Sequence, residues 1–261
     1  MMWIIFAVIA AVIICIFLIR WDDRRIVRSR YVLETDREGM RIVHLSDIHS
    51  CDFTDRVIKR VCAENPDLIV VTGDLWDRTK LNIPDMTAFM KRLANICDTV
   101  YIPGNHEFHE PQHEQIFQQL AELGVNVLRH RIMDFKGVSI LGMDVLKYGA
   151  FNEAELKRLE KRGGYRIAAA HFPQFFEEVY SEYDIDLVLC GHAHGGQFRI
   201  PFTKIGLYSP GMGIFPKYSE GLHERGGVKM IVSRGIGNSR FPFRLFNPPE
   251  MIVIDLRSRK A

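Results

Sequence analysis

Side chains that bind metal ions follow five short apolar runs in this 261-residue chain. Taken singly, a carboxylate in a turn or an isolated imidazole has an ordinary structural explanation. Taken together, the two carboxylates, four imidazoles and one carboxamide would nearly fill two adjoining ion sites. Oxygen and nitrogen ligands without thiolate suit Mn, Fe, Zn or Co, and the ligand chemistry does not choose among them. The candidate ligands are Asp47, His49, Asp74, Asn105, His171, His192 and His194.

The spacing of these residues predicts how they act together. His49 lies two residues after Asp47, so an extended backbone leaving a strand would direct both side chains to one side. Asp74 follows Gly73, where the backbone can turn sharply, and its two oxygens can bridge two ions. The pattern therefore predicts two divalent cations that share one carboxylate.

Such a pair of ions points to phosphoester hydrolysis. Two ions about 3.5–4 Å apart would hold a bridging hydroxide as nucleophile and stabilise the charge of an in-line displacement. The leaving alkoxide needs a proton, and His106, next to Asn105, is the candidate donor. Asp77 would hold that imidazole in its protonated form, although capping the turn before Asn82 is an alternative role for it.

The same residues resemble the pattern of the calcineurin-like metallophosphoesterase superfamily over about residues 41–256. The Gly-His-Ala-His-Gly-Gly-Gln run at 191–197, with the apolar N-terminus, is similar to a bacterial membrane-associated subgroup, some of whose relatives hydrolyse lipid-linked or nucleotide-linked phosphodiesters. Glu107 stands where many members have Asp, at a position that is not a ligand in the family. The motifs that carry the resemblance are Asp47-x-His49, Gly73-Asp74-x-x-Asp77, Gly104-Asn105-His106-Glu107, His171 and Gly191-His192-x-His194.

The resemblance implies a role for each candidate residue. One ion would be held by Asp47, His49 and His194, and Asp74 would lie between the two ions. His106 would act as the acid or stabilise the transition state, with Asp77 as its partner. The second ion would be held by Asn105, His171 and His192.

Composition bounds the class of protein. A chain with 47% apolar and 25% charged residues is ordinary globular material, enough for one catalytic domain. The net charge of +2, with both signs interspersed, disfavours nucleic acid as a partner, and no obligate protein partner is predicted. The five cysteines show no CxxC spacing, which argues against a disulfide framework and favours a reducing compartment.

The N-terminus differs from the rest of the chain. Residues 3–19 are uninterrupted apolar sequence, and at about 1.5 Å per residue they cover roughly 25 Å, just enough for a short transmembrane helix. Several arginines follow this run and none precedes it, which predicts a single-pass protein of the cell membrane with its catalytic domain on the cytoplasmic face. A buried N-terminal helix is the alternative. We therefore divide the chain into an anchor at 1–20, a connector at 21–40 and a catalytic domain at 41–261.

Beyond residue 40, β-rich runs alternate with segments of helical period, which predicts an α/β protein. Helices are expected at 54–65, 83–96, 110–123 and 152–162, and strands at 125–128 and 138–146. Strand-like segments at 198–208, 228–233 and 251–256 imply a second, more antiparallel sheet. The resulting fold class is a four-layer α/β-β/α sandwich, as the resemblance also implies.

The substrate is predicted only as a class. The expected activity is that of a phosphodiesterase or pyrophosphatase on a small or lipid-linked phosphoester; a phosphomonoesterase and a non-enzymatic membrane-tethered scaffold are the alternatives. In the loop at 234–246, Arg240 or Arg244 could pair with a phosphate while Phe241 and Phe243 meet acyl chains. In the alternative arrangement these Phe side chains pack into the core and the arginines are solvated.

Overall fold

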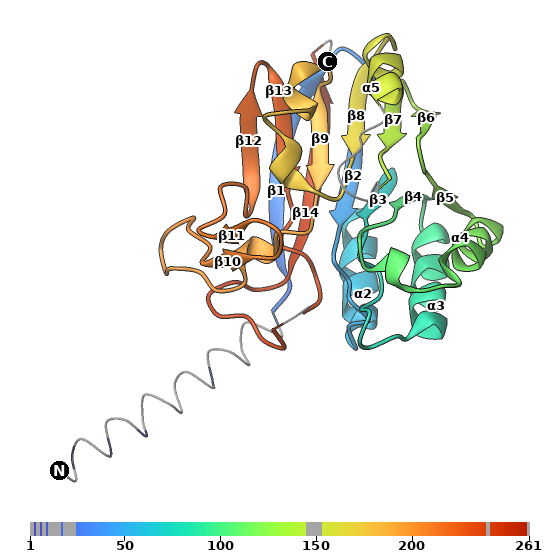
Figure 1. Ribbon diagram of the computed structural model, residues 1–261. Helices are drawn as coiled ribbons and strands as arrows, with labels where there is room; N and C mark the ends of the chain where they lie inside the picture. The colour runs from blue at the N-terminus through green and yellow to red at the C-terminus, as the bar shows by residue number, and fades with distance from the viewer. Residues whose placement is uncertain are drawn as a thin grey trace.

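The computed structural model describes residues 25–144, 153–238 and 241–259, together with Trp3, Phe6, Ile9 and Phe17. Its main elements are two six-stranded mixed sheets. The first has the order β1-β14-β2-β3-β4-β5 and the second β12-β13-β9-β8-β7-β6 (Figure 1). The strands of the first sheet are β1 (Val27–Thr35), β14 (Glu250–Ser258), β2 (Met40–Leu45), β3 (Leu68–Thr72), β4 (Asp98–Ile102) and β5 (Val125–Val127).

The second sheet is built from the later part of the chain. Two further short strands, β10 (Tyr208–Ser209) and β11 (Gly213–Ile214), pair with each other outside both sheets. The strands of the second sheet are β12 (Gly221–Arg225), β13 (Val228–Val232), β9 (Leu187–Cys190), β8 (Tyr165–Ala169), β7 (Val138–Gly142) and β6 (Arg131–Phe135).

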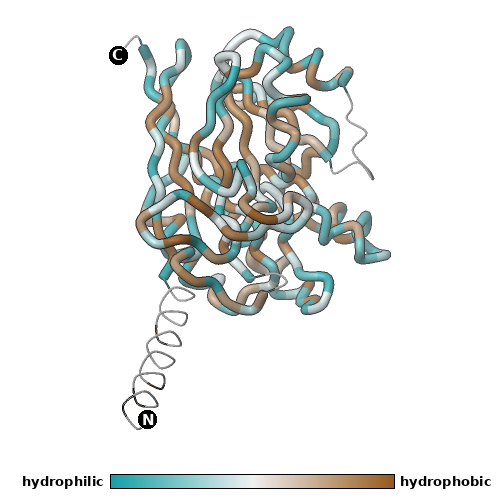
Figure 2. The backbone as a smooth tube through the Cα atoms, turned by 60° about the vertical axis from the view of Figure 1, so that its left-hand side comes forward, coloured by the Kyte–Doolittle hydropathy of each residue, from teal (hydrophilic) through white to brown (hydrophobic). Residues whose placement is uncertain are grey.

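Three apolar clusters separate four layers of structure. One cluster packs the first sheet against α2 (Thr54–Glu64), α3 (Ile83–Ala94) and α4 (His113–Glu122). A second lies between the sheets, where Ile42 and Val70 meet Ile167 and other apolar residues. The third packs the second sheet against α5 (Glu153–Glu160) and short 3-10 turns. Apolar colouring follows the central strands in Figure 2, and the predicted α/β sandwich is confirmed.

The predicted helices are present with small shifts at their ends. The one expected at 110–123 starts at His113, after a separate 3-10 turn at Glu107–His109. The ends of the strand expected at 138–146 and of the helix expected at 152–162 lie partly outside the described residues.

The structure differs from the expectation at the two ends of the first sheet. Residues 27–35, assigned to the connector, form β1 and pair in parallel with β14. β14 also pairs antiparallel with β2, so the last strand joins the first sheet and not the second. The reason is burial: most of β14 is buried on both faces, which suits an interior strand, whereas β1 alternates with exposed residues as an edge strand does. Residues 198–208 form mainly loop.

The predicted anchor at 1–20 lies outside the described residues apart from four positions. Within the described part of the chain, no helix combines the length and the apolar character that a membrane span requires.

The topology brings the carboxyl ends of many strands to one region. β2, β3, β4 and β5 run parallel in the first sheet, and β7, β8, β9 and β13 run parallel in the second. In open α/β sheets, side chains that bind ligands follow the carboxyl ends of such strands. Both sheets therefore contribute loops to a common site.

Candidate metal centre

Each candidate ligand lies within a few residues of a strand end. Asp47 follows β2, Asp74 follows β3 and Asn105 follows β4, all from the first sheet. His171 follows β8, and the loop that carries His192 and His194 follows β9. Residues more than 140 positions apart in the sequence are thereby brought into contact.

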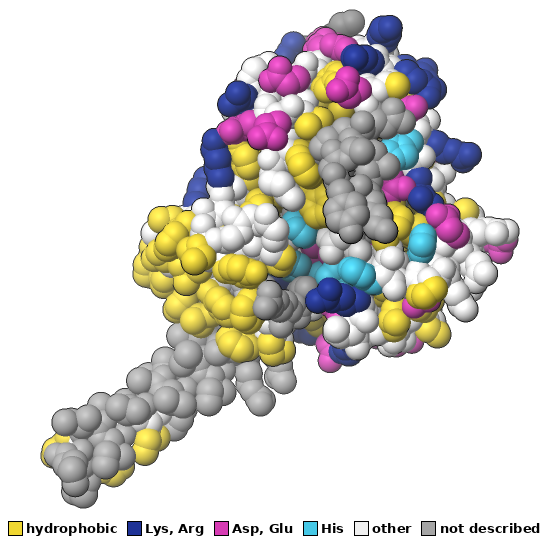
Figure 3. All heavy atoms as spheres, viewed as in Figure 1, with side chains coloured by type: hydrophobic (Ala, Val, Ile, Leu, Met, Phe, Trp, Pro, Cys, Tyr) yellow, Lys and Arg dark blue, Asp and Glu magenta, His cyan; other side chains and the backbone are white. Residues whose placement is uncertain are grey.

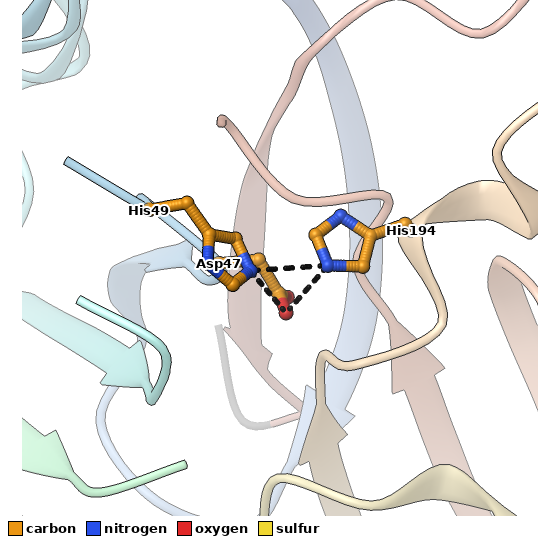
Figure 4. A group of neighbouring side chains, drawn as sticks. All are labelled: Asp47, His49 and His194. Carbon is orange, nitrogen blue, oxygen red and sulfur yellow. Dashed lines mark hydrogen bonds and ion pairs between the residues drawn. The ribbon is translucent and has the colours of Figure 1, made fainter. Parts of the chain in front are cut away.

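Asp47, His49 and His194 form the first ligand group, shown in Figure 4. His194 Nε2 lies 3.4 Å from Asp47 Oδ1 and 3.1 Å from His49 Nε2. All three side chains are buried. Their converging atoms can surround one cation.

Asp74, His171 and His192 form a second group, also buried. His171 Nε2 lies 3.3 Å from Asp74 Oδ2. That same oxygen lies 3.6 Å from His49 Nε2 of the first group. One carboxylate oxygen therefore faces both groups, as the sharing of Asp74 between two ions requires.

A buried polar atom at this centre supports the presence of a cation there. Asn105 Oδ1 has no hydrogen-bond partner among the described residues, and His171 Nε2 faces Asp74 Oδ2 at 3.3 Å. Buried polar atoms in native proteins are almost always satisfied, and Asn105 is next in sequence to His106, whose backbone N–H donates to Asp74 Oδ1, so the lack of a partner for Asn105 Oδ1 fits a cation site here. The donor set fits divalent ions of the Mn, Fe, Zn or Co type.

The backbone at these ligands is left-handed, contrary to the extended conformation predicted for Asp47 and His49. Their φ angles are 52° and 46°, and Asp74 has a φ of 52°. Non-glycine residues adopt this region at some cost, and such strain concentrates at functional sites. The side chains converge because the loop coils, and not because residues two apart share a strand face.

The electrostatics of the centre reflect its buried charges. Burial raises the pKa of Asp47, and burial also lowers the pKa of His192 to about 3. Burial opposes a charge on His171 as well, but Asp74 and Asp47 outweigh it and raise the pKa of this imidazole to about 10. The two carboxylates thus favour a positive charge at this position.

His106 lies at the more open side of the centre, with 12% of its side chain exposed. The backbone N–H of Arg78 donates to His106 Nδ1 at 3.2 Å. A neutral imidazole that accepts at Nδ1 carries its proton on Nε2. Nε2 lies 4.0 Å from Asp74 Oδ2, so this N–H faces the shared carboxylate.

Asp77 lies between two imidazoles, and the prediction that it holds His106 in its protonated form is wrong, because His106 Nδ1 accepts from Arg78 and burial lowers the pKa of His106 to about 4. Its Oδ2 is 3.4 Å from His49 Nδ1 and 3.5 Å from His106 Nδ1. Its Oδ1 accepts a hydrogen bond of 2.7 Å from the N–H of Thr79, so it also shapes the following turn. Burial opposes its charge, yet His49 and Thr79 hold the pKa of Asp77 below its usual range.

Glu107 is a supporting residue whose role the sequence analysis did not identify. Its buried carboxylate accepts backbone N–H groups from Asp74 (3.0 Å), Leu75 (2.7 Å) and Gly104 (2.6 Å). These bonds join the loop after β3 to the loop after β4. The one feature of the sequence that indicated a role for Glu107 is its position directly after Gly104-Asn105-His106.

Asn247 plays a similar part for the loop of His194. Its Nδ2 donates to the carbonyl oxygens of His194 at 2.7 Å and Gln197 at 3.1 Å. Asn247 is 50 or more positions away from these residues, so no local pattern in the sequence pointed to it.

The structure contradicts pairing of Arg244 with a substrate phosphate. Arg244 is fully buried, and its guanidinium donates to Asn238 Oδ1 at 2.9 Å and to the carbonyl oxygen of Arg234 at 2.6 Å. Its donors are directed mainly at its own loop, and Nη2 also lies 3.5 Å from Nδ1 of His194. Arg240 lies outside the described residues. Phe241 and Phe243 are half-buried and contact the ring of Phe198.

The fold and this centre together define a metal-dependent phosphoesterase, and comparison with known proteins agrees. Residues 40–196 match the calcineurin-like phosphoesterase family, and the chain belongs to that family. The superfamily expected from the motifs is thereby confirmed. Membership of the membrane-associated subgroup stays a prediction.

Several curated bacterial proteins are similar to this chain. An uncharacterized metallophosphoesterase of Bacillus subtilis is 30% identical over 85% of this chain and 80% of its own length. Phosphodiesterase YaeI of Escherichia coli is 29% identical over 88% of this chain and 87% of its own. An uncharacterized metallophosphoesterase of Helicobacter pylori is 29% identical over 87% of this chain, which spans only 62% of that relative.

Solved structures share the fold at low sequence identity. TT1561 of Thermus thermophilus aligns with a TM-score of 0.52 and 13% identity, covering 76% of this chain and 90% of that one. A dimetal phosphatase from Danio rerio aligns with a TM-score of 0.51 and 11% identity, covering 76% and 88%. These likenesses concern the fold alone.

Proposed function

We propose that this chain is a membrane-anchored phosphodiesterase or pyrophosphatase that acts on a small or lipid-linked phosphoester. The assignment as a two-metal hydrolase rests on the position of Asp74 Oδ2. This oxygen lies 3.3 Å from His171 Nε2 and 3.6 Å from His49 Nε2, so it faces both ligand groups. The similarity to a protein named as a phosphodiesterase, over nearly the full length of both chains, supports diesters over monoesters.

The residues of the centre fall into two sets of ligands, one for each metal ion. Two bound divalent ions would act as Lewis acids: they would lower the pKa of a water molecule and polarise the phosphoryl oxygen. Asp47, His49 and His194 would hold one ion, and Asn105, His171 and His192 the other, with Asp74 between them. The strand-end loops hold these ligands in place before substrate arrives, which limits the reorganisation needed during reaction.

His106 is the group that meets the substrate. Its Nε2–H faces the shared carboxylate from the more open side of the centre, and the N–H of Arg78 keeps the proton on that nitrogen. From there it donates to a phosphoryl or leaving-group oxygen. Asp77 orients His49, whose Nδ1 lies 3.4 Å from its Oδ2; His106 Nδ1, 3.5 Å from the same oxygen, accepts from Arg78 and has no proton to donate to it.

The N-terminal sequence supports the membrane part of the proposal. Residues 3–19 are apolar throughout, and Trp3, Phe6, Ile9 and Phe17 are all at least half exposed. Exposed apolar side chains of this kind do not fit a helix buried in the domain core. The arginines after residue 19 favour a catalytic domain on the cytoplasmic face of the cell membrane.

The test is hydrolysis by purified full-length protein loaded with Mn, Zn, Fe or Co, on monoesters, on bis(p-nitrophenyl) phosphate and on a lipid pyrophosphate. We expect turnover of a diester or pyrophosphate that exceeds turnover of the monoester, and its loss in Asp74→Asn. Asp98→Asn, an exposed carboxylate at the start of β4, is the matched control. A preference for monoesters would reject the diesterase assignment, and no turnover with any metal would favour the non-enzymatic scaffold.

A further inference from the structure

An apolar lobe projects from the domain beside the metal centre. We define it as residues 200–215, which include β10 and β11. Phe202 is fully exposed, and Ile214 and Phe215 are 73% and 62% exposed. Figure 3 shows an area of apolar side chains over the region of β10 and β11, next to histidine side chains. Such a patch on a folded domain marks a binding surface.

The lobe is an ordered structure that holds its aromatic rings outward. The N–H of Thr203 donates to Ile200 O at 3.2 Å, and the N–H of Ile200 donates to Ile205 O at 3.1 Å, closing a turn around Phe202. Phe202 and Phe215 both have left-handed backbones, with φ of 63° and 54°. A bulky residue rarely adopts this conformation, so two exposed aromatics in it indicate a constraint other than folding.

The lobe lies close to the start of the domain. The N–H of Arg199, at its base, donates to Leu245 O at 3.1 Å, and the N–H of Val27 donates to Pro249 O at 2.7 Å. The segment 245–249 thus lies between the lobe and β1. Only residues 20–26 separate the apolar run at 3–19 from β1, and at 3.3–3.6 Å per residue they reach at most about 25 Å.

The charge of the lobe fits an anionic surface. The lobe contains no Asp or Glu, and its exposed charged residue is Lys204; Lys217, just beyond it, is paired with Glu177. Exposed aromatic and aliphatic side chains with flanking Lys are the composition of segments that enter the interface of a lipid bilayer.

We propose that the apolar lobe docks into the lipid bilayer and turns the metal centre toward the membrane surface. The lobe is continuous with the ligand loop: the N–H of Leu207 donates to Gly196 O at 3.1 Å, and a Cβ added at Gly211 would lie 3.3 Å from His192 Nε2. Docking at this lobe brings the phosphate groups of lipids to the rim of the centre. The inference rests on the membrane placement proposed above and requires no particular substrate.

The test uses photo-crosslinking in full-length protein reconstituted into vesicles of phosphatidylcholine and phosphatidylglycerol. The photoreactive residue p-benzoylphenylalanine replaces Phe202 or Phe215, and Lys161 is the control because it is exposed and follows α5, which lies far from β10 and β11 in Figure 1. We expect lipid adducts, detected by mass spectrometry, several-fold more often at 202 and 215 than at 161. Equal yields at the three positions, or adducts only to a second copy of the chain, would overturn the proposal.

A second measurement separates docking of the lobe from anchoring of the chain. The variant F202D/F215D changes only exposed side chains, so we expect it to fold, to sediment with vesicles and to hydrolyse a soluble diester as the wild type does. Residues 200–215 should show slower amide hydrogen exchange on vesicles in the wild type but not in the variant. Failure to sediment would count against the anchor; sedimentation without protection of the wild-type lobe would count against the docking.

Discussion

Two carboxylates, Asp47 and Asp74, are buried on either side of His49, whose Nε2 lies 3.9 Å and 3.6 Å from their oxygens. Like charges in a medium of low dielectric repel strongly unless cations or protons separate them. At the scale of single residues, this centre is therefore unfavourable as a purely structural arrangement and favourable as a cation site.

His106 can be tested apart from the ligands. Replacing it with Ala removes the Nε2–H that faces Asp74 without removing a metal ligand, so kcat should fall by about 10²–10⁴-fold while metal content stays at the wild-type level. Steady-state kinetics on bis(p-nitrophenyl) phosphate and elemental analysis measure the two quantities. His130→Ala, in the turn before β6, is the control. A parallel loss of metal and activity would assign His106 to metal retention instead.

His44 makes a prediction about stability and pH. It is buried in β2, its Nε2 lies 2.8 Å from Thr72 Oγ1, and burial lowers its pKa to about 3. Below pH 6.5 the unfolded chain takes up a proton at this residue and the folded chain does not until near pH 3. The free energy of unfolding should therefore fall on acidification, by about 1.4 kcal/mol between pH 7.5 and pH 5.5.

The comparison of wild type with His44→Gln isolates this contribution. Urea unfolding at pH 7.5 and 5.5, with a chelator present in both cases, should show a loss of stability on acidification that is about 1.4 kcal/mol smaller in the variant. An equal loss in both proteins would mean that His44 is protonated in the folded state or does not titrate in this range.

At the scale of elements, the loops after β3 and β4 are packed against each other through glycines. A Cβ at Gly104 would lie 2.6 Å from the backbone nitrogen of Asp74 and would also collide with its carboxylate. Gly104→Ala should therefore displace Asp74 and weaken Mn binding by about 10–100-fold or more, with the fold retained. Calorimetric titration with Mn and circular dichroism check both parts.

Gly163→Ala is the matched control for this prediction. The nearest atom to its added Cβ is Arg37 Nη2 at 3.8 Å, an ordinary contact, so Mn affinity should not change. If Gly104→Ala binds Mn as the wild type does, the two loops are more compliant than their close packing indicates.

The elements also show what the sequence could and could not predict. Mainly apolar runs followed within a few residues by Gly, Asp or His were enough to place β2, β3, β4, β8 and β9, because buried parallel strands contain few polar residues. The pairing of β14 with β1 and β2 could not be predicted, since it joins residues more than 200 positions apart. Local patterns carry no information about such partners.

The same limit applies to the centre. Motif spacing was enough to name Asp47, His49 and His194, which the structure brings into one group. The left-handed backbone at Asp47 and His49, and the support from Asn247, depend on contacts across the fold. Side-chain type is local information, whereas the conformation that directs a side chain is set by its tertiary partners.

At the scale of the whole molecule, the metal centre joins the two sheets. Asp47, Asp74 and Asn105 follow strands of the first sheet, and His171 and His194 follow strands of the second. Ions held between them would cross-link the sandwich in the folded state and have no comparable site in the unfolded chain.

Free Mn at 100 times its dissociation constant should then stabilise the protein by about 2.7 kcal/mol, which corresponds to roughly 5–10 °C in Tm. Differential scanning calorimetry with Mn or with chelator measures this shift, and Asp74→Asn should show little of it because it loses the oxygen that both ligand groups share. A Tm that does not depend on Mn, or the same rise in Asp74→Asn, would mean that the ions are not held between the sheets.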